Sequence, residues 1–225
     1  MTLRHDLDVF PVIPWLRDND RFSGYLPTVV SCIWRQDCPV KLREPYVTPP
    51  FNGSFEEGRM NRLNAITDRI NYGIEKFLKS EATHVWLVDG DIEVPLHALY
   101  TLIKMDVDLA SGIYSFHNDK YMAMFGRMPE EESFRFVPRD IKVLRQQIIG
   151  DEFRVGGGNG CLLIKRRVFN RYHPQVHPLR FLCPADYASD LYFWHRAQKM
   201  GFTARVNGNV LCGHLPYWPL SSYEE

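Results

Sequence analysis

The tripeptide Asp89-Gly90-Asp91 is the segment whose residue types and spacing point most directly to chemistry. Two carboxylates at positions i and i+2 leave an extended segment on the same side, so both can reach one ligand. They follow an apolar run at residues 84–88, and the ligand crevices of open α/β sheets lie beyond the carboxyl ends of strands. Carboxylate oxygens suit a hard cation, Mg²⁺ or Mn²⁺, and Gly90 leaves room for a phosphate or a sugar beside the backbone. The competing interpretation is a turn whose aspartates only cap the next helix.

A further carboxylate, Asp190, stands at the start of an aromatic-rich segment that is predicted to be helical over residues 189–200. A carboxylate held at a helix start and facing a cleft can act as a general base. The helix dipole at that end keeps the group ionised. Alternatively, Ser189 and Asp190 only cap the helix, which stabilises any helix by about 1 kcal/mol.

The glycine-rich run at residues 156–160 precedes a predicted strand. A dinucleotide-binding fingerprint opens a helix instead, and a Walker A loop needs a Gly-Lys-Ser/Thr sequence, which this run lacks. The run therefore indicates a backbone that passes very close to something, either a ligand or simply the inside of a flexible turn.

Three other residues are candidates for the same site. His214 follows a predicted strand, although a lone histidine is more often a hydrogen-bonded residue than a ligand. Arg62 and Arg69 lie seven residues apart on a helix predicted over residues 59–80 and therefore share a face. Such arginines are usually solvated.

Hydrophobic periodicity supplies the elements that would position these residues. Helices are predicted at 59–80, at 96–105 after Pro95, and at 189–200 before Gly201, with a helical turn or two at 166–172. Strands are predicted at 28–34, 84–88, 108–114 and 161–164, with shorter ones at 44–48, 121–125, 134–137, 202–206 and 209–212. This alternation predicts a single α/β domain over residues 1–225 on a mostly parallel sheet with a small antiparallel part, between an irregular arm (1–27) and an irregular tail (215–225).

The composition excludes several classes of protein. The chain has 225 residues, and its 27 Lys and Arg balance 27 Asp and Glu, so no net field recruits nucleic acid or an anionic membrane. The apolar runs fall far short of the roughly 20 residues of a transmembrane segment, and residues 1–6 do not resemble a signal peptide. The five cysteines form no CxxC pair, which argues for reduced thiols and a cytoplasmic location; they are Cys32, Cys38, Cys161, Cys183 and Cys212.

In their order and spacing, these segments resemble a GT-A glycosyltransferase, the fold of the nucleotide-diphospho-sugar transferases, nearest to its family-2-like group. The resemblance covers roughly residues 28–214. It rests on the following segments: Arg69-Ile70-Asn71, Asp89 and Asp91 with Pro95, residues 108–114, residues 157–164, Asp190 with Arg196 and Gly201, and Cys212-Gly213-His214. Ser189 stands where the family usually has Glu, and no first-strand nucleotide contact is recognisable at residues 28–34.

The resemblance implies a hexosyltransferase-like enzyme that uses Mn²⁺ or Mg²⁺. Asp89 and Asp91 would hold the cation on the donor diphosphate with His214 as a further ligand, and Asp190 would be the base of an inverting transfer. The residues implied in donor binding are Arg62, Arg69, Asp89, Gly90, Gly157 and Gly158. The donor would be a UDP- or GDP-sugar, and the acceptor a glycan or a lipid-linked or protein-linked group.

Two other functions remain open. A sugar-phosphate nucleotidyltransferase shares a related sheet, but it usually has a glycine-rich loop with a basic residue directly after its first strand, and this chain has none. A non-catalytic carbohydrate-binding module would use its aromatic residues, 13% of the chain, to stack on sugar rings. Such a module should show no metal-dependent affinity for nucleotides.

Overall fold

A computed structural model describes residues 6–15, 24–50, 59–127, 137–145, 147–150, 155–170, 180–182 and 189–223. Within these residues, eight strands form the central sheet. They are β1 (Asp8–Ile13), β2 (Lys41–Leu42), β3 (Tyr46–Val47), β4 (His84–Val88), β6 (Leu109–Ile113), β10 (Ile148–Ile149), β12 (Cys161–Lys165) and β13 (Ala204–Leu211).

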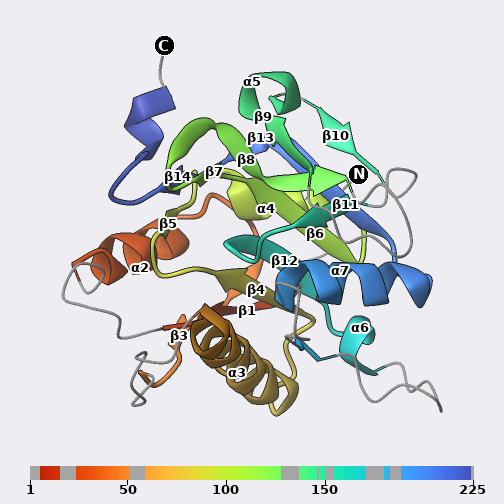
Figure 1. Cartoon of the computed structure of the whole chain (residues 1–225). Coiled ribbons are helices and arrows are strands. Elements are labelled where there is room, and N and C mark those ends of the chain that lie inside the picture. The colour runs from red at the N-terminus through yellow and green to blue at the C-terminus, as the bar shows by residue number, and fades with distance from the viewer. Residues whose placement is uncertain are drawn as a thin grey trace.

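The sheet has the order β10-β13-β6-β12-β4-β1-β2, and β3 also pairs with β1 (Figure 1). Strand β1 is parallel to β2, β3 and β4, and β13 is parallel to β6. Strand β12 runs antiparallel between β4 and β6, and β10 runs antiparallel to β13. The sheet is therefore mainly parallel, with one reversed strand at its centre.

Two smaller antiparallel sheets lie beside the central one. The first consists of β7 (Ser115–Phe116), β8 (Asp119–Arg127), β9 (Val137–Asp140) and β11 (Val155–Gly157). The second pairs β5 (Ile92–Glu93) with β14 (Gly213–His214). A short 3₁₀ helix, η2 (Leu220–Tyr223), follows.

Helices cover both faces of the central sheet. On one face, α3 (Arg59–Leu78) and α7 (Ser189–Lys199) share a core with the shorter helices α5 (Ile141–Leu144) and α6 (Arg167–Asn170). On the other face, α2 (Leu26–Trp34) and α4 (Ala98–Lys104) form a second core. Strand β4 serves both cores because its side chains alternate: Val85 and Leu87 face α3, whereas Trp86 and Val88 face α2 and α4.

Most of the predicted elements are confirmed, and so is a single α/β domain with a mainly parallel sheet. The predicted helices correspond to α3, α4 and α7, and Gly201 ends α7 with a φ of +80°. The main predicted strands at 84–88, 108–114 and 161–164 correspond to β4, β6 and β12. Among the shorter ones, residues 202–212 contain the single strand β13 in place of two, and the tail carries η2.

The prediction of a strand at residues 28–34 is wrong, because this segment belongs to helix α2. Its β-branched residues suggested a strand, but the buried side chains are Val29, Cys32 and Ile33, which have the i, i+3, i+4 spacing of a helix face. Pro27 lies in the first turn, where a proline favours helix formation.

The prediction of an irregular arm over residues 1–27 is also wrong, because it contains the central strand β1. Pro11 hid this strand, since proline is rarely found inside a sheet. The carbonyls of Leu7, Val9 and Ile13 accept hydrogen bonds from the β2 and β3 side, so Pro11 faces that side too. Its position falls between the short strands β2 and β3, where a missing N–H leaves no strand partner unsatisfied.

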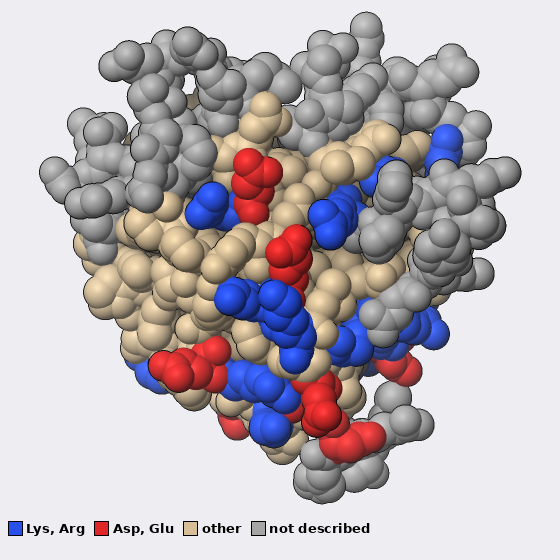
Figure 2. Space-filling model, turned by 90° about the horizontal axis from the view of Figure 1, so that it is seen from below, with Lys and Arg blue, Asp and Glu red and all other residues tan. Residues whose placement is uncertain are grey.

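The charged surface agrees with the balanced composition. Figure 2 shows basic and acidic side chains interspersed on the face seen from below, rather than gathered by sign. None of the described helices combines the length and the apolar character that a membrane crossing requires.

His84, at the start of β4, is a buried histidine that the fold keeps neutral. Its side chain is 7% exposed, and its Nδ1 lies 2.9 Å from the hydroxyl of Thr83. Burial lowers the pKa of His84 to about 4, and the nearby charge of Lys165 acts in the same direction.

We expect acid to destabilise the fold through His84. The folded-state pKa lies below the unfolded value of about 6.5, so the stabilising effect is lost as the pH falls from 6.5 towards 4. Urea unfolding at pH 7 and pH 5 should show a loss of about 2 kcal/mol from this group, which the variant His84→Gln does not suffer. An equal pH dependence in both proteins would contradict this assignment.

Candidate metal centre

The parallel strands bring the candidate residues to one edge of the sheet. Strand β1 is parallel to β4, and β4 and β6 are parallel to each other because both pair with the reversed strand β12. Strand β13 is parallel to β6. The segments that follow these four strands therefore leave the sheet at the same edge, and the amino end of β12 lies there too.

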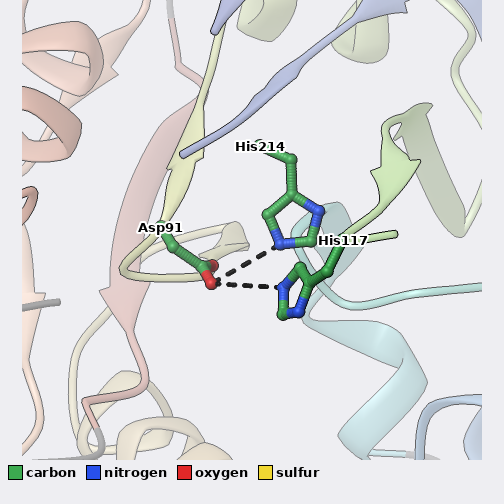
Figure 3. A group of neighbouring side chains, drawn as sticks. All are labelled: Asp91, His117 and His214. Carbon is green, nitrogen blue, oxygen red and sulfur yellow. Dashed lines mark ion pairs between the residues drawn. The ribbon is translucent and has the colours of Figure 1, made fainter. Parts of the chain in front are cut away.

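Asp91, His117 and His214 form a compact group at this edge (Figure 3). Oδ2 of Asp91 lies 3.5 Å from Nε2 of His214 and 3.8 Å from Nε2 of His117. Within the described residues, these three supply ligand atoms that all lie within 4.8 Å of one another. Asp91 follows β4, His117 lies in the turn between β7 and β8, and His214 lies in β14. The structure thus brings His214 to Asp91, the proximity that the resemblance implied.

Hydrogen bonds fix His214 in the orientation that a metal ligand needs. The imidazole is buried, and its Nδ1 lies 2.6 Å from the carbonyl oxygen of Ser115, to which it donates its proton. Its Nε2 is therefore the atom with a free lone pair, and it is this atom that faces Asp91. The N–H of Leu215 also donates to the carbonyl oxygen of Asp91 at 2.8 Å, which ties the two segments together.

The turn that follows β14 packs against His117 and holds the backbone of the residue before it. The ring of Tyr217 stacks on that of His117, with centroids 5.4 Å apart, and the indole N–H of Trp218 donates to the carbonyl oxygen of Phe116 at 3.0 Å. The rings of His117 and His214 lie 4.0 Å apart. His117 is the more accessible of the two, with 46% of its side chain exposed, so a ligand can reach it from solvent.

The charges of the group stabilise one another. Burial alone would raise the pKa of Asp91, but the neighbouring imidazoles of His117 and His214 outweigh it and hold that pKa well below its usual range. Burial would lower the pKa of His214, but the neighbouring Asp91 carboxylate raises it overall. A metal ion would therefore compete with a proton for Nε2 of His214.

One carboxylate and two imidazoles can hold a divalent cation. Imidazole nitrogen suits transition metals, Fe²⁺ and Zn²⁺ more strongly than Mn²⁺, whereas Mg²⁺ and Ca²⁺ take a shell of oxygen atoms. The donor set therefore favours Mn²⁺ over Mg²⁺, the two cations that the sequence suggested.

Asp89 lies outside the group of Asp91, His117 and His214 but within electrostatic range of it. Burial, followed by the charges of Asp91 and Asp190, raises the pKa of Asp89 to about 7. Burial also raises the pKa of Asp190 to about 6, opposed by the N–H of Leu191, which donates to its Oδ1 at 2.8 Å. The two carboxyl groups therefore titrate near neutral pH, where proton transfer is most effective.

The glycine-rich run packs against the side chain of Tyr114. A Cβ atom at Gly158 would lie 1.8 Å from the Tyr114 hydroxyl, and one at Gly160 would lie 2.7 Å from its ring. The N–H of Gly160 donates to that hydroxyl at 3.1 Å. Gly157 has ordinary contact, its nearest neighbour being Trp194 at 3.5 Å. Tyr114 also meets His214 edge-on at 5.6 Å, and so connects the glycine turn to the group of Asp91, His117 and His214.

The structure places the other predicted residues as follows. A Cβ at Gly90 would lie 2.9 Å from the ring of Trp15, so what approaches this backbone is an indole. Arg69 donates from Nη1 to the carbonyl oxygen of Pro49 at 3.1 Å. Asn71 holds the backbone of Phe181 by two hydrogen bonds, a structural role. The side chain of Arg62 and all of Cys183 lie outside the described part of the chain.

Sequence reasoning missed His117 and Trp15. The signal for His117 was its position four residues after the strand Leu109–Ile113, whose carboxyl end faces the same edge as Asp91. Trp15 had no comparable signal, because β1 itself was not recognised.

Neither a protein-family model nor a curated protein matches this chain. Among solved structures, it is similar to one described as the crystal structure of A197 from STIV, with a TM-score of 0.58 and 12% sequence identity. The match covers 93% of this chain and 86% of that one. At this identity the likeness extends to the fold alone.

We expect Asp91→Asn, His117→Gln and His214→Gln each to weaken Mn²⁺ binding by at least tenfold, because each removes one of three ligands. Titration calorimetry without nucleotide would measure this. His97→Gln is the matched control. His97 is an exposed histidine outside this group, and its Nε2 lies 3.1 Å from the carbonyl oxygen of Asn209. Undiminished Mn²⁺ affinity in Asp91→Asn would remove this group as a metal site.

The packing on Tyr114 gives a second expectation. Gly158→Ala should destabilise the fold by about 1–3 kcal/mol, because its Cβ collides with the Tyr114 hydroxyl. Gly157→Ala, one residue earlier, meets only ordinary contacts and should cost clearly less. Thermal unfolding measures the stability of both variants. Equal losses of stability would mean that contact with Tyr114 does not explain the glycine at position 158.

Proposed function

We propose that this chain is a metal-dependent glycosyltransferase that moves a sugar from a nucleoside-diphosphate donor to an acceptor hydroxyl. The observation that carries the proposal is the convergence of Asp91, His117 and His214 beside Asp89 and Asp190 at the carboxyl edge of the sheet. The resemblance of the segment order to GT-A glycosyltransferases supports the same conclusion.

The metal group suits the leaving diphosphate. A divalent cation held by Asp91, His117 and His214 would stabilise the negative charge that develops on the departing nucleoside diphosphate. The chain's own contribution is to hold the ligand atoms ready: Ser115 orients His214, and Tyr217 packs on His117.

Asp190 suits the role of general base. Its pKa of about 6 leaves it mostly ionised at pH 7 and makes it more basic than an ordinary aspartate, whose pKa is about 3.9. The N–H of Leu191 donates to Oδ1 of Asp190. The carboxylate would accept the proton of the acceptor hydroxyl. The acceptor oxygen then bonds to the anomeric carbon as its bond to the diphosphate breaks, and attack from the opposite face inverts the configuration.

The donor would be a UDP- or GDP-sugar, and the acceptor a glycan or a lipid-linked or protein-linked hydroxyl. The resemblance also assigns Asp89 to the cation and the donor. Its carboxyl is buried, and the charges of Asp91 and Asp190 add to that burial in raising its pKa.

Replacement of Asp190 tests the mechanism. Asp190→Asn keeps an oxygen for the Leu191 N–H, so it should fold and bind donor normally, but transfer should fall about 10²- to 10⁴-fold through loss of the base. A thermal-shift panel of UDP-, GDP- and dTDP-sugars with Mn²⁺ selects the donor, and release of nucleoside diphosphate measures turnover. Near-normal turnover in Asp190→Asn would leave this residue as a helix cap only.

A further inference from the structure

The group of Asp91, His117 and His214 differs from the ligand set that the resemblance implies. The resemblance places two carboxylates and one imidazole around the cation, those of Asp89, Asp91 and His214. Among the described residues, the structure gathers one carboxylate and two imidazoles, and Asp89 is not a member of the group. A nitrogen ligand thus stands in place of an oxygen ligand, and this exchange changes which ion the site prefers.

The spacing of the ligand atoms fits a tetrahedral ion. Oδ2 of Asp91 lies 3.5 Å from Nε2 of His214 and 3.8 Å from Nε2 of His117, and both rings turn these atoms towards the carboxylate (Figure 3). Around a tetrahedral Zn²⁺ with bonds of about 2.0–2.1 Å, neighbouring ligand atoms lie about 3.3–3.4 Å apart. Around an octahedral Mg²⁺ with bonds of the same length, adjacent ligand atoms lie only about 2.9 Å apart. Both observed distances are closer to the tetrahedral value.

The group leaves one position of such an ion open. No fourth histidine, cysteine or carboxylate of the described ranges belongs to it. His214 is buried, but 46% of the His117 side chain is exposed, so solvent reaches the group from that side. Structural zinc sites have four protein ligands, whereas catalytic ones have three and bind water or substrate in the fourth position. The group has the composition of the catalytic kind.

Both imidazoles have neighbours that orient them. Nδ1 of His214 lies 2.6 Å from the carbonyl oxygen of Ser115, the kind of outer partner that metal-binding histidines usually have. The ring of His117 stacks on that of Tyr217, with centroids 5.4 Å apart. All three ligand atoms therefore come from oriented side chains of this chain, and no nucleotide oxygen is needed to complete the set.

We propose that Asp91, His117 and His214 form a zinc site, which binds Zn²⁺ more tightly than Mn²⁺ and does so without a nucleotide. Zn²⁺ lies above Mn²⁺ in the affinity order of first-row ions, and it accepts tetrahedral coordination by imidazole and carboxylate. The inference goes beyond the proposed function, because zinc binding requires neither a nucleotide nor transfer activity. In the proposed transfer, the open position is the one that a diphosphate oxygen would take.

Calorimetry without nucleotide tests the preference. Wild-type protein should bind Zn²⁺ at least about tenfold more tightly than Mn²⁺. In His117→Glu a carboxylate replaces the second imidazole, so the ratio of the Zn²⁺ affinity to the Mn²⁺ affinity should fall by about tenfold. Partial unfolding would weaken both ions alike and leave this ratio unchanged. His97→Glu is the matched control, because His97 is an exposed histidine outside the group, and this variant should keep the wild-type ratio.

Cobalt provides a measurement that needs no variant. Co²⁺ replaces Zn²⁺ in such sites and absorbs visible light much more strongly in tetrahedral than in octahedral coordination. Wild-type protein with Co²⁺ should show the strong tetrahedral absorption. Equimolar Zn²⁺ should remove this absorption by displacing the cobalt, and equimolar Mn²⁺ should not. A weak octahedral spectrum would overturn the zinc site.

The outcomes separate this inference from the proposed function. Equal affinities of the wild-type protein for Zn²⁺ and Mn²⁺, or an unchanged ratio in His117→Glu, would overturn the zinc site while metal-dependent transfer stands. Preferred Zn²⁺ binding and a tetrahedral cobalt spectrum, in a protein that binds neither UDP nor GDP with any of these ions, would support the zinc site and overturn the proposed transfer.

Discussion

The reversed strand β12 is the constraint on which the candidate site depends. Its antiparallel pairing places Cys161 opposite Val88 and Leu162 opposite Ser111, so its amino end meets the carboxyl ends of β4 and β6. The glycine turn before β12 consequently lies against Asp89, whose N–H donates to the carbonyl oxygen of Gly160. A parallel strand in this position would carry the turn to the opposite edge and leave Tyr114 uncovered.

The sequence predicts those parts of the structure whose information is local. Helical spacing in α3 and the apolar run of β4 identify these elements without any tertiary contact, and Asp91 follows from its position after β4. Helix α2 and strand β1 are different. A β-branched helix and a proline-containing central strand contradict local propensity, and only their tertiary neighbours make them favourable.

The candidate site shows the same division. His214 was predicted from its place after a strand and from the family resemblance. His117 joins it because β7, the strand directly before His117, lies beside β14, and local sequence does not encode that tertiary contact. The glycine-rich run at positions 158 and 160 predicted a close approach correctly, whereas at Gly90 the expected neighbour was a phosphate or a sugar and the observed one is a tryptophan ring. The partners are Trp15 and Tyr114, which lie far away in the sequence, so spacing could not reveal them.

The hydrogen bond from His214 to Ser115 has a consequence for the order in which the chain folds. It joins residues 99 positions apart, and the contact between Leu220 and Glu93 spans 127. Closing such long loops costs conformational entropy before any contact is gained, so this edge of the sheet is expected to order late in folding. A bound cation would cross-link three distant segments and favour the folded chain by mass action, so that metal supply and folding yield become linked quantities.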